Sequence, residues 1–278
     1  MSISWSDFWQ NVRDEFGHVA ALFARKKKPT KKPKGDNMTA YAIVRESTRL
    51  TDGDAVRLAE AATLQNLDVA AGWDMAPRKS FVLSSGQPLP KFAVLCRLRD
   101  TAAGDPDGAV AYHTVEDGVP VVHVLVDVAM GLPVADADGN PLSPLDNVSC
   151  ALTHENTEEG GDAFCVTISP RGDGTSEPQE ECDRCQGYSY RKTLSDGSTM
   201  AVTDFLLPAA FGDGSQSRPF DHLDKLKHAR DIGKGGYCVV IKADGRESEV
   251  FGDRKAALAY SRAMLDKHAP HVLRASIP

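Results

Sequence analysis

The stretch His154-Glu155-Asn156-Thr157-Glu158 decides how the rest of this 278-residue chain is interpreted. Residues four apart lie on the same face of an α-helix, so His154 and Glu158 would direct an imidazole and a carboxylate towards one point. Such a pair on a helix is typical of a zinc site, and Glu155 stands beside it, where a general base is placed in zinc-dependent hydrolysis. The common form of this pattern ends in a second histidine. An ordinary solvated helix face that carries one histidine is therefore the alternative.

The composition is that of a soluble globular protein, with 41% hydrophobic and 26% charged residues. A net charge of −7 argues against nucleic-acid binding by the body as a whole. We expect no membrane contact, because no apolar run approaches the roughly 18 residues of a membrane span, and we recognise no signal-peptide pattern. Six cysteines are few for this length, which favours a core that does not depend on a disulfide framework.

Two distinct segments are predicted ahead of the body. Large apolar residues recur at helical spacing in residues 1–24, which predicts an amphipathic anchoring helix that needs a protein partner surface. Residues 25–37 are predicted to form an extended linker, because residues 25–34 contain seven basic residues and two prolines. This linker is interpreted either as a solvated tether or as an electrostatic contact with an acidic partner or nucleic acid.

The body is expected to begin near Met38 and to have an α+β fold, since strands and a helix precede the helix that carries His154. Strands are expected at 41–44, 81–83, 92–95 and 119–128, with a turn at 116–118. Thr51 is expected to cap the first helix of the body. Irregular loops, a hairpin at 238–251 and a last helix at 253–267 are expected to complete the chain.

The limits of the helix that carries His154 are predicted from local signals. Asp146 or Asn147 is expected to cap its start. Gly160-Gly161 is expected to end it just after Glu158. A third zinc ligand would then come from elsewhere in the chain. Acidic candidates follow downstream at Glu177, Glu180, Glu181 and Asp183.

The pair Cys182-x-x-Cys185 allows three interpretations. Together with Cys150 and Cys165 it could complete a structural metal site. A disulfide between Cys165 and one member of the pair is the second interpretation, and unbridged thiols are the third.

A series of short motifs resembles a family of largely uncharacterised zincin-like (HExxE) metallopeptidase-like proteins of phages and bacteria. The order and approximate spacing of these motifs agree over about residues 75–237. In this chain they are Tyr112-His113, Asp117-Gly118-Val119-Pro120, Thr153 to Glu158 with Asp162, Glu180-Glu181-Cys182-Asp183, Tyr190, the segment 202–211 and Gly235-Gly236-Tyr237.

This resemblance implies a zincin-like mixed sheet with a metal-site helix over residues 38–237, followed by a hairpin and helix over 238–278. It also implies roles for individual residues: Glu155 as general base; His154, Glu158 and Glu180, or Asp183 in its place, as zinc ligands; and Asp162 as a group that steadies His154. Asn156-Thr157 departs from the family, which has an apolar pair there. The prolines that the family has after Asp162 and Asp183 are also missing, and these departures predict a loosened site.

Two functions follow as expectations. The first is a zinc-metallopeptidase-like domain that is tethered by residues 1–24 to a larger assembly such as a phage particle. The second is a non-catalytic structural or adaptor virion protein with the same fold and a vestigial site. A nucleic-acid-binding arm at 25–34 is a third hypothesis. The expected location is the virion, or otherwise the cytoplasm.

Overall fold

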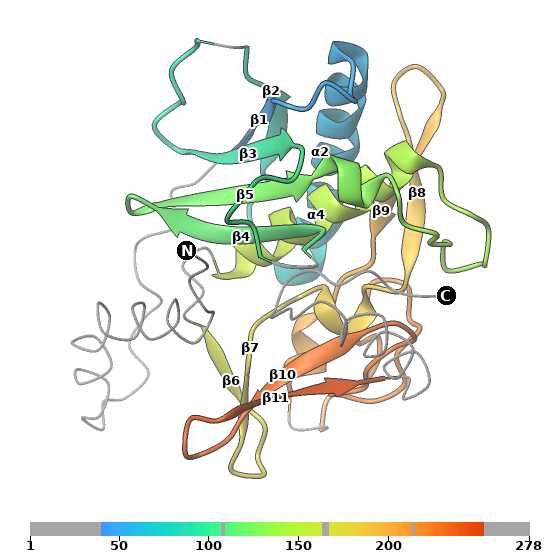
Figure 1. The fold of residues 1–278 in the computed structure, drawn as a ribbon. Coiled ribbons are helices and arrows are strands. Elements are labelled where there is room, and N and C mark those ends of the chain that lie inside the picture. The colour runs from blue at the N-terminus through green and yellow to red at the C-terminus, as the bar shows by residue number, and fades with distance from the viewer. Residues whose placement is uncertain (1–39, 85, 107–108, 163–166, 213–214, 253–278) are drawn as a thin grey trace. The chain divides into compact units, whose positions relative to one another are not determined.

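The structure is a computed structural model, and it describes residues 40–252 except 85, 107–108, 163–166 and 213–214 (Figure 1). The helix expected at 1–24, the linker at 25–37 and the helix at 253–267 lie outside the described residues. All described residues belong to one compact unit, whose first residue is Met38.

Five strands form the main sheet, in the order β2-β1-β3-β5-β4 (Figure 1). Their bounds are Ala40–Arg45 for β1, Lys79–Val82 for β2, Ala93–Arg99 for β3, Ala111–Glu116 for β4 and Val119–Leu125 for β5. Neighbouring strands are parallel except at one edge, where β4 runs antiparallel to β5. Asp117 and Gly118 join this pair with φ values of 49° and 78°, and a two-residue hairpin turn of this kind favours Asp-Gly.

Two long helices, α2 (Asp52–Trp73) and α4 (Pro144–Asp162), pack against the same face of the main sheet. The short helix α3 (Val126–Ala129) follows β5, so the strand expected at 119–128 ends at Leu125. Every second residue of the central strands enters the core with the helices. The core includes Tyr41, Ile43, Val94, Cys96, Leu98, Val122 and Val124 from the strands and Leu58, Ala62, Val148 and Leu152 from the helices. The α+β class is confirmed.

Capping residues explain where both helices begin. Thr51 caps α2 as predicted: its Oγ1 accepts a hydrogen bond from Asp54 N at 3.1 Å. The prediction that Asp146 or Asn147 caps α4 is wrong, because Ser143 does so. Ser143 Oγ accepts from Asp146 N at 3.1 Å, and Ser143 N donates to Asp146 Oδ2 at 3.2 Å. Asp146 is thus the acidic member of the capping box rather than the cap.

The prediction that Gly160-Gly161 ends α4 is also wrong, since the helix continues to Asp162. Gly161 instead allows the Glu181 side chain to pack closely against α4. A Cβ atom at this position would overlap the buried carboxylate of Glu181. The glycine therefore makes room for a downstream side chain and does not break the helix.

The rest of the described chain forms smaller elements that cover α4 and the end of the sheet (Figure 1). A four-stranded sheet has the order β11-β10-β7-β6, with bounds Glu247–Phe251, Tyr237–Ile241, Ser176–Pro178 and Ile168–Pro170. A separate hairpin joins β8 (Ser189–Thr193) and β9 (Thr199–Thr203), and two 3₁₀-helices lie at Asp183–Cys185 (η1) and Pro208–Phe211 (η2).

The hairpin expected near residues 238–251 is confirmed as β10–β11, whereas the irregular loops expected before it contain strands β6 to β9. Strands of three to five residues that are interrupted by glycine, proline and aspartate read as loops in a sequence. Strand β10 pairs with β7, so this hairpin is part of the body. Among the described helices, none combines the length and the apolar character needed to cross a membrane.

Candidate metal centre

The helix α4 carries the His-Glu motif on buried faces. His154, Glu155 and Glu158 are only 2%, 2% and 4% exposed, because α4 is enclosed by the main sheet, α2 and the β8–β9 hairpin. The four-residue spacing has the expected result: His154 Nε2 lies 3.0 Å from Glu158 Oε1. An acidic, solvated helix face is thereby excluded.

Two residues at the start of η1 complete the donor set. Asp183 Oδ1 lies 3.4 Å from His154 Nε2. Cys182 Sγ and the ligand atoms of His154 and Glu158 all lie within 4.8 Å of one another. Cys182 N also donates to Glu158 Oε1 at 3.2 Å, which fixes η1 against α4. Tyr237, from β10, forms a hydrogen bond with the Asp183 carboxylate.

The spacing of these donors fits a divalent ion. Zinc bonds of roughly 2.0–2.2 Å to nitrogen and oxygen place two ligands of a tetrahedral ion roughly 3.3 Å apart. The separations of 3.0 and 3.4 Å from His154 Nε2 lie on either side of that value. Among the described residues, this buried nitrogen has no partner in hydrogen-bonding geometry. A ring nitrogen surrounded by carboxylates in this way is suited to coordination.

The electrostatics of the site also favour a cation. Burial lowers the pKa of His154, but Glu158 and Asp183 outweigh it, so that the pKa is raised well above its usual value. Burial and the charge of Glu158 raise the pKa of Asp183 to about 6. In the described part of the chain, no lysine or arginine forms an ion pair with Glu155, Glu158 or Asp183. Within that part of the chain, the three carboxylates are therefore compensated only by the histidines that face them.

The other predicted site residues lie around this centre. Glu180 lines a small cavity with Glu177 and Arg184, while the contact with His154 is made by Asp183. Asp162 Oδ2 accepts a hydrogen bond from Thr167 N at 2.6 Å. Eight residues of helix separate Asp162 from His154, which is roughly 12 Å along the axis. Its role as a support for His154 stays a prediction.

Glu155 faces the edge strand of the sheet. Its Oε2 lies 3.1 Å from His113 Nδ1, and His113 belongs to β4. One ligand atom each from His113, Glu155 and Glu158 form a second group within 4.8 Å. The sequence named His113 only as part of a motif, because β4 is half polar and its strand was not predicted.

The five described cysteines (Cys96, Cys150, Cys182, Cys185 and Cys238) are free thiols. Of the three interpretations of Cys182 and Cys185, the free thiols agree with the structure and the disulfide with Cys165 does not; Cys165 itself lies outside the described residues. The cysteines are separated by packing: Cys182 packs with Val69 and Phe205, and Cys185 lies in a different apolar cluster. Cys150 lines a cavity of about 220 Å³ that reaches His154. Among the described residues, these thiols do not gather into a structural metal site.

The loosened site expected from Asn156-Thr157 stays a prediction, although both residues are buried. Asn156 is fully buried; its backbone carbonyl accepts a hydrogen bond from the Tyr41 hydroxyl, and its side-chain Oδ1 accepts one from Cys96 Sγ at 3.2 Å. Thr157 Oγ1 donates to Thr153 O at 2.7 Å, and Thr157 is 2% exposed. Thr157 therefore packs with its hydroxyl bonded to the backbone, whereas Asn156 Nδ2 is buried with no hydrogen-bond partner among the described residues.

In comparisons with known proteins, no protein-family model, curated protein or solved structure matches the chain. The functional assignment therefore depends on the donor set and its surroundings.

Proposed function

We propose that this chain contains a zinc-metallopeptidase-like domain whose centre is built on α4 and η1. One observation carries the proposal: His154 Nε2 lies 3.0 Å from one buried carboxylate and 3.4 Å from another, and no lysine or arginine among the described residues is ion-paired with either. Burying such charges without compensation costs several kcal/mol per ion, so a bound cation would stabilise the fold.

His154, Glu158 and Asp183 are the residues that would hold the ion. We assign the third position to Asp183 in place of Glu180, because Asp183 contacts the imidazole. A zinc ion bound there would polarise a carbonyl group and acidify a water molecule. Glu155 would accept the proton from that water, and the bond from His113 would hold the Glu155 carboxylate in one orientation.

The donor set limits the rate that this centre can support. Two carboxylates and one neutral imidazole cancel the charge of a divalent ion, whereas two imidazoles and one carboxylate leave a positive charge. The ion should consequently be a weaker Lewis acid, and we expect modest turnover.

The assignment agrees with the zincin-like resemblance, which implies a mixed sheet beside a metal-site helix. We also propose, from the sequence alone, that residues 1–24 anchor the domain to a protein assembly such as a phage particle. Residues 25–34 would serve as its tether. A pull-down from assembled particles with and without residues 1–24 tests this part separately.

The metal content of the purified, untagged full-length chain tests the proposal. We expect zinc in at least one equivalent, lost in His154→Ala and retained in His123→Gln. His123 is a suitable control because it is also buried but lies on the face of the main sheet that the helices do not cover. A wild-type chain that binds no divalent metal and is equally stable without it contradicts the proposal.

The non-catalytic alternative is favoured by Cys182. If its thiolate joins His154, Glu158 and Asp183, four protein donors surround the ion, and closed sites of this kind are structural. A peptide-library assay separates the two functions. Turnover by the wild-type chain that is absent in Glu155→Gln indicates an enzyme, whereas zinc binding without turnover indicates a structural or adaptor protein.

A further inference from the structure

The second donor group lies between α4 and the edge strand β4. It consists of His113, Glu155 and Glu158, with one ligand atom from each within 4.8 Å of the other two. His113 pairs with Val122 across β4 and β5, so it points to the helix-covered face, as the core residue Val122 does. The side chains of His113 and Glu155 are 7% and 3% exposed.

The spacing in this group again fits two ligands of one ion. His113 Nδ1 and Glu155 Oε2 are 3.1 Å apart, close to the roughly 3.3 Å expected of ligand atoms on a tetrahedral zinc. Coordination through Nδ1 requires the ring tautomer that carries its proton on Nε2. The ring can adopt this tautomer without a change in position.

A charge count shows why one ion is not enough. Glu155, Glu158 and Asp183 carry up to three buried negative charges, and among the described residues no lysine or arginine is ion-paired with them. The nearby Glu159 is different, because Arg78 Nη1 lies 2.6 Å from its Oε2. One divalent cation would leave one uncompensated charge, whereas two cations with a bound hydroxide would balance the three carboxylates.

Glu158 belongs to both donor groups. Its Oε1 lies 3.0 Å from His154 Nε2, and a bridging carboxylate would use its second oxygen for the other ion. A carboxylate that bridges two ions holds them about 3.5–4 Å apart, as in two-metal hydrolytic centres.

We propose that His113, Glu155 and Glu158 bind a second divalent cation, which Glu158 bridges to the ion held at His154. This inference rests on the proposed function and changes one role within it. Glu155 becomes a ligand through one oxygen, while its other oxygen remains available as the base.

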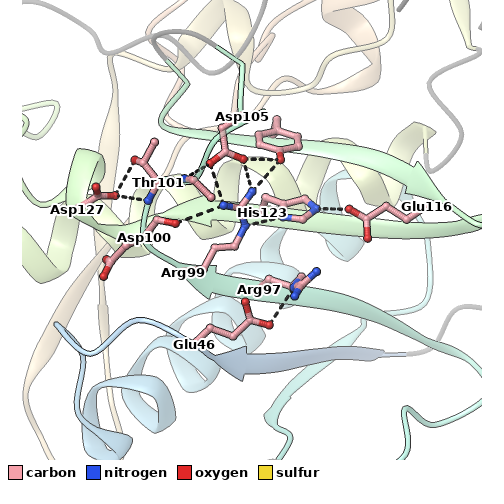
Figure 2. Close-up of polar contacts among 11 residues, drawn as sticks. Glu46, Arg97, Arg99, Asp100, Thr101, Asp105, Glu116, His123 and Asp127 are labelled. Atoms are coloured by element: carbon pink, nitrogen blue, oxygen red, sulfur yellow. Dashed lines mark hydrogen bonds and ion pairs between the residues drawn. The ribbon is translucent and has the colours of Figure 1, made fainter. Parts of the chain in front are cut away.

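The opposite face of the sheet supplies a matched control. His123, one strand away on β5, also contacts a glutamate: its Nε2 lies 2.8 Å from Glu116 Oε1 (Figure 2). Its other nitrogen, Nδ1, accepts a hydrogen bond from Arg99 Nε at 3.1 Å, and Glu116 is 46% exposed at its side chain. This pair does not call for a cation, because Arg99 already bonds to His123 and the Glu116 carboxylate is exposed to solvent.

The experiment measures how much zinc the full-length, untagged, metal-stripped chain retains after loading and dialysis. We expect two equivalents in the wild type, one in His113→Gln and two in His123→Gln. Circular dichroism of the stripped variants checks that they fold.

The outcomes separate this inference from the proposed function. One equivalent in the wild type, or no difference between wild type and His113→Gln, overturns the second cation site and leaves the first intact. No bound zinc at all overturns both. If His113→Gln does not fold, the wild-type stoichiometry alone decides, since one equivalent is sufficient to overturn the inference.

Discussion

The two faces of the main sheet each bury a histidine against a glutamate, but they balance the charge in different ways. The outer face is the one that carries His123 and that α2 and α4 do not cover. There, Arg97 Nε lies 2.9 Å from Glu46 Oε1, and Arg99 Nη1 donates to Asp105 Oδ2 at 2.8 Å (Figure 2). On the helix-covered face, Glu155 and Glu158 meet histidines and further carboxylates. A histidine–glutamate contact by itself therefore says little about metal binding; the supply of positive charge around it decides.

Consecutive residues of one strand serve both faces. Tyr112 stacks on His123 with ring centroids 4.6 Å apart, while His113 reaches Glu155 on the other side. Side chains alternate between the faces of a strand, so the motif Tyr112-His113 contributes one residue to each. This alternation makes the two faces independent targets for substitution.

The largest difference between the faces should appear in catalysis. Replacing Glu155 by glutamine removes the proposed general base and should reduce peptide hydrolysis by about 10²–10⁴-fold. Replacing Glu116 by glutamine, the matched change on the outer face, should leave hydrolysis within about twofold. Initial rates on a peptide library provide the measurement, and equal rates for Glu155→Gln and the wild type would remove the assigned role.

Zinc should stabilise the chain through one face only. Zinc at 100 times its Kd should raise the free energy of unfolding by about 2.7 kcal/mol per site. The gain should disappear in His154→Ala and persist in His123→Gln, as followed by thermal unfolding with and without chelator. A similar gain in His154→Ala would place the zinc elsewhere.

The outer face should contribute to stability without metal. Arg99→Met leaves the half-buried Asp105 carboxylate without its arginine and should cost about 1–3 kcal/mol of unfolding free energy. Urea denaturation measures this loss, and the zinc content of the variant should match the wild type. A variant that loses its zinc would show that the two faces are coupled.

The smallest expected effect is a pH dependence of the unfolding free energy that Arg99→Met loses. Burial raises the pKa of Asp105, but hydrogen bonds from Arg99 and Ala102 N outweigh it, so the pKa is lowered. A carboxyl group with a lowered folded pKa stabilises the fold above its unfolded pKa of about 3.9 and loses that contribution as the pH falls towards the folded value. The difference between wild type and Arg99→Met should therefore narrow between pH 5 and pH 3. A constant difference would mean that Arg99 acts through packing alone.

The sequence predicted those features of the site that depend on local spacing. His154 and Glu158 meet because they are one helical turn apart, and Thr51 caps α2 because its side chain bonds to Asp54 N. The choice of Asp183 as the contact of His154 depends on how η1 packs on α4, and no local pattern encodes that distance.

Other features were missed because one residue type has several physical uses. The pair Gly160-Gly161 is typical of a helix end, yet Gly161 provides space for Glu181 within α4. His113 was seen only in a motif, because its contact with Glu155 joins residues 42 positions apart through the edge strand. Long-range packing of this kind is what the sequence alone did not provide.

The most direct test of the central claim is the position of the ion. Diffraction data from zinc-loaded crystals of the full-length chain, collected on both sides of the zinc absorption edge, locate it. The account predicts an anomalous peak within about 2.0–2.2 Å of His154 Nε2 and of a carboxylate oxygen of Glu158. A zinc-loaded crystal with no peak at His154 would contradict it.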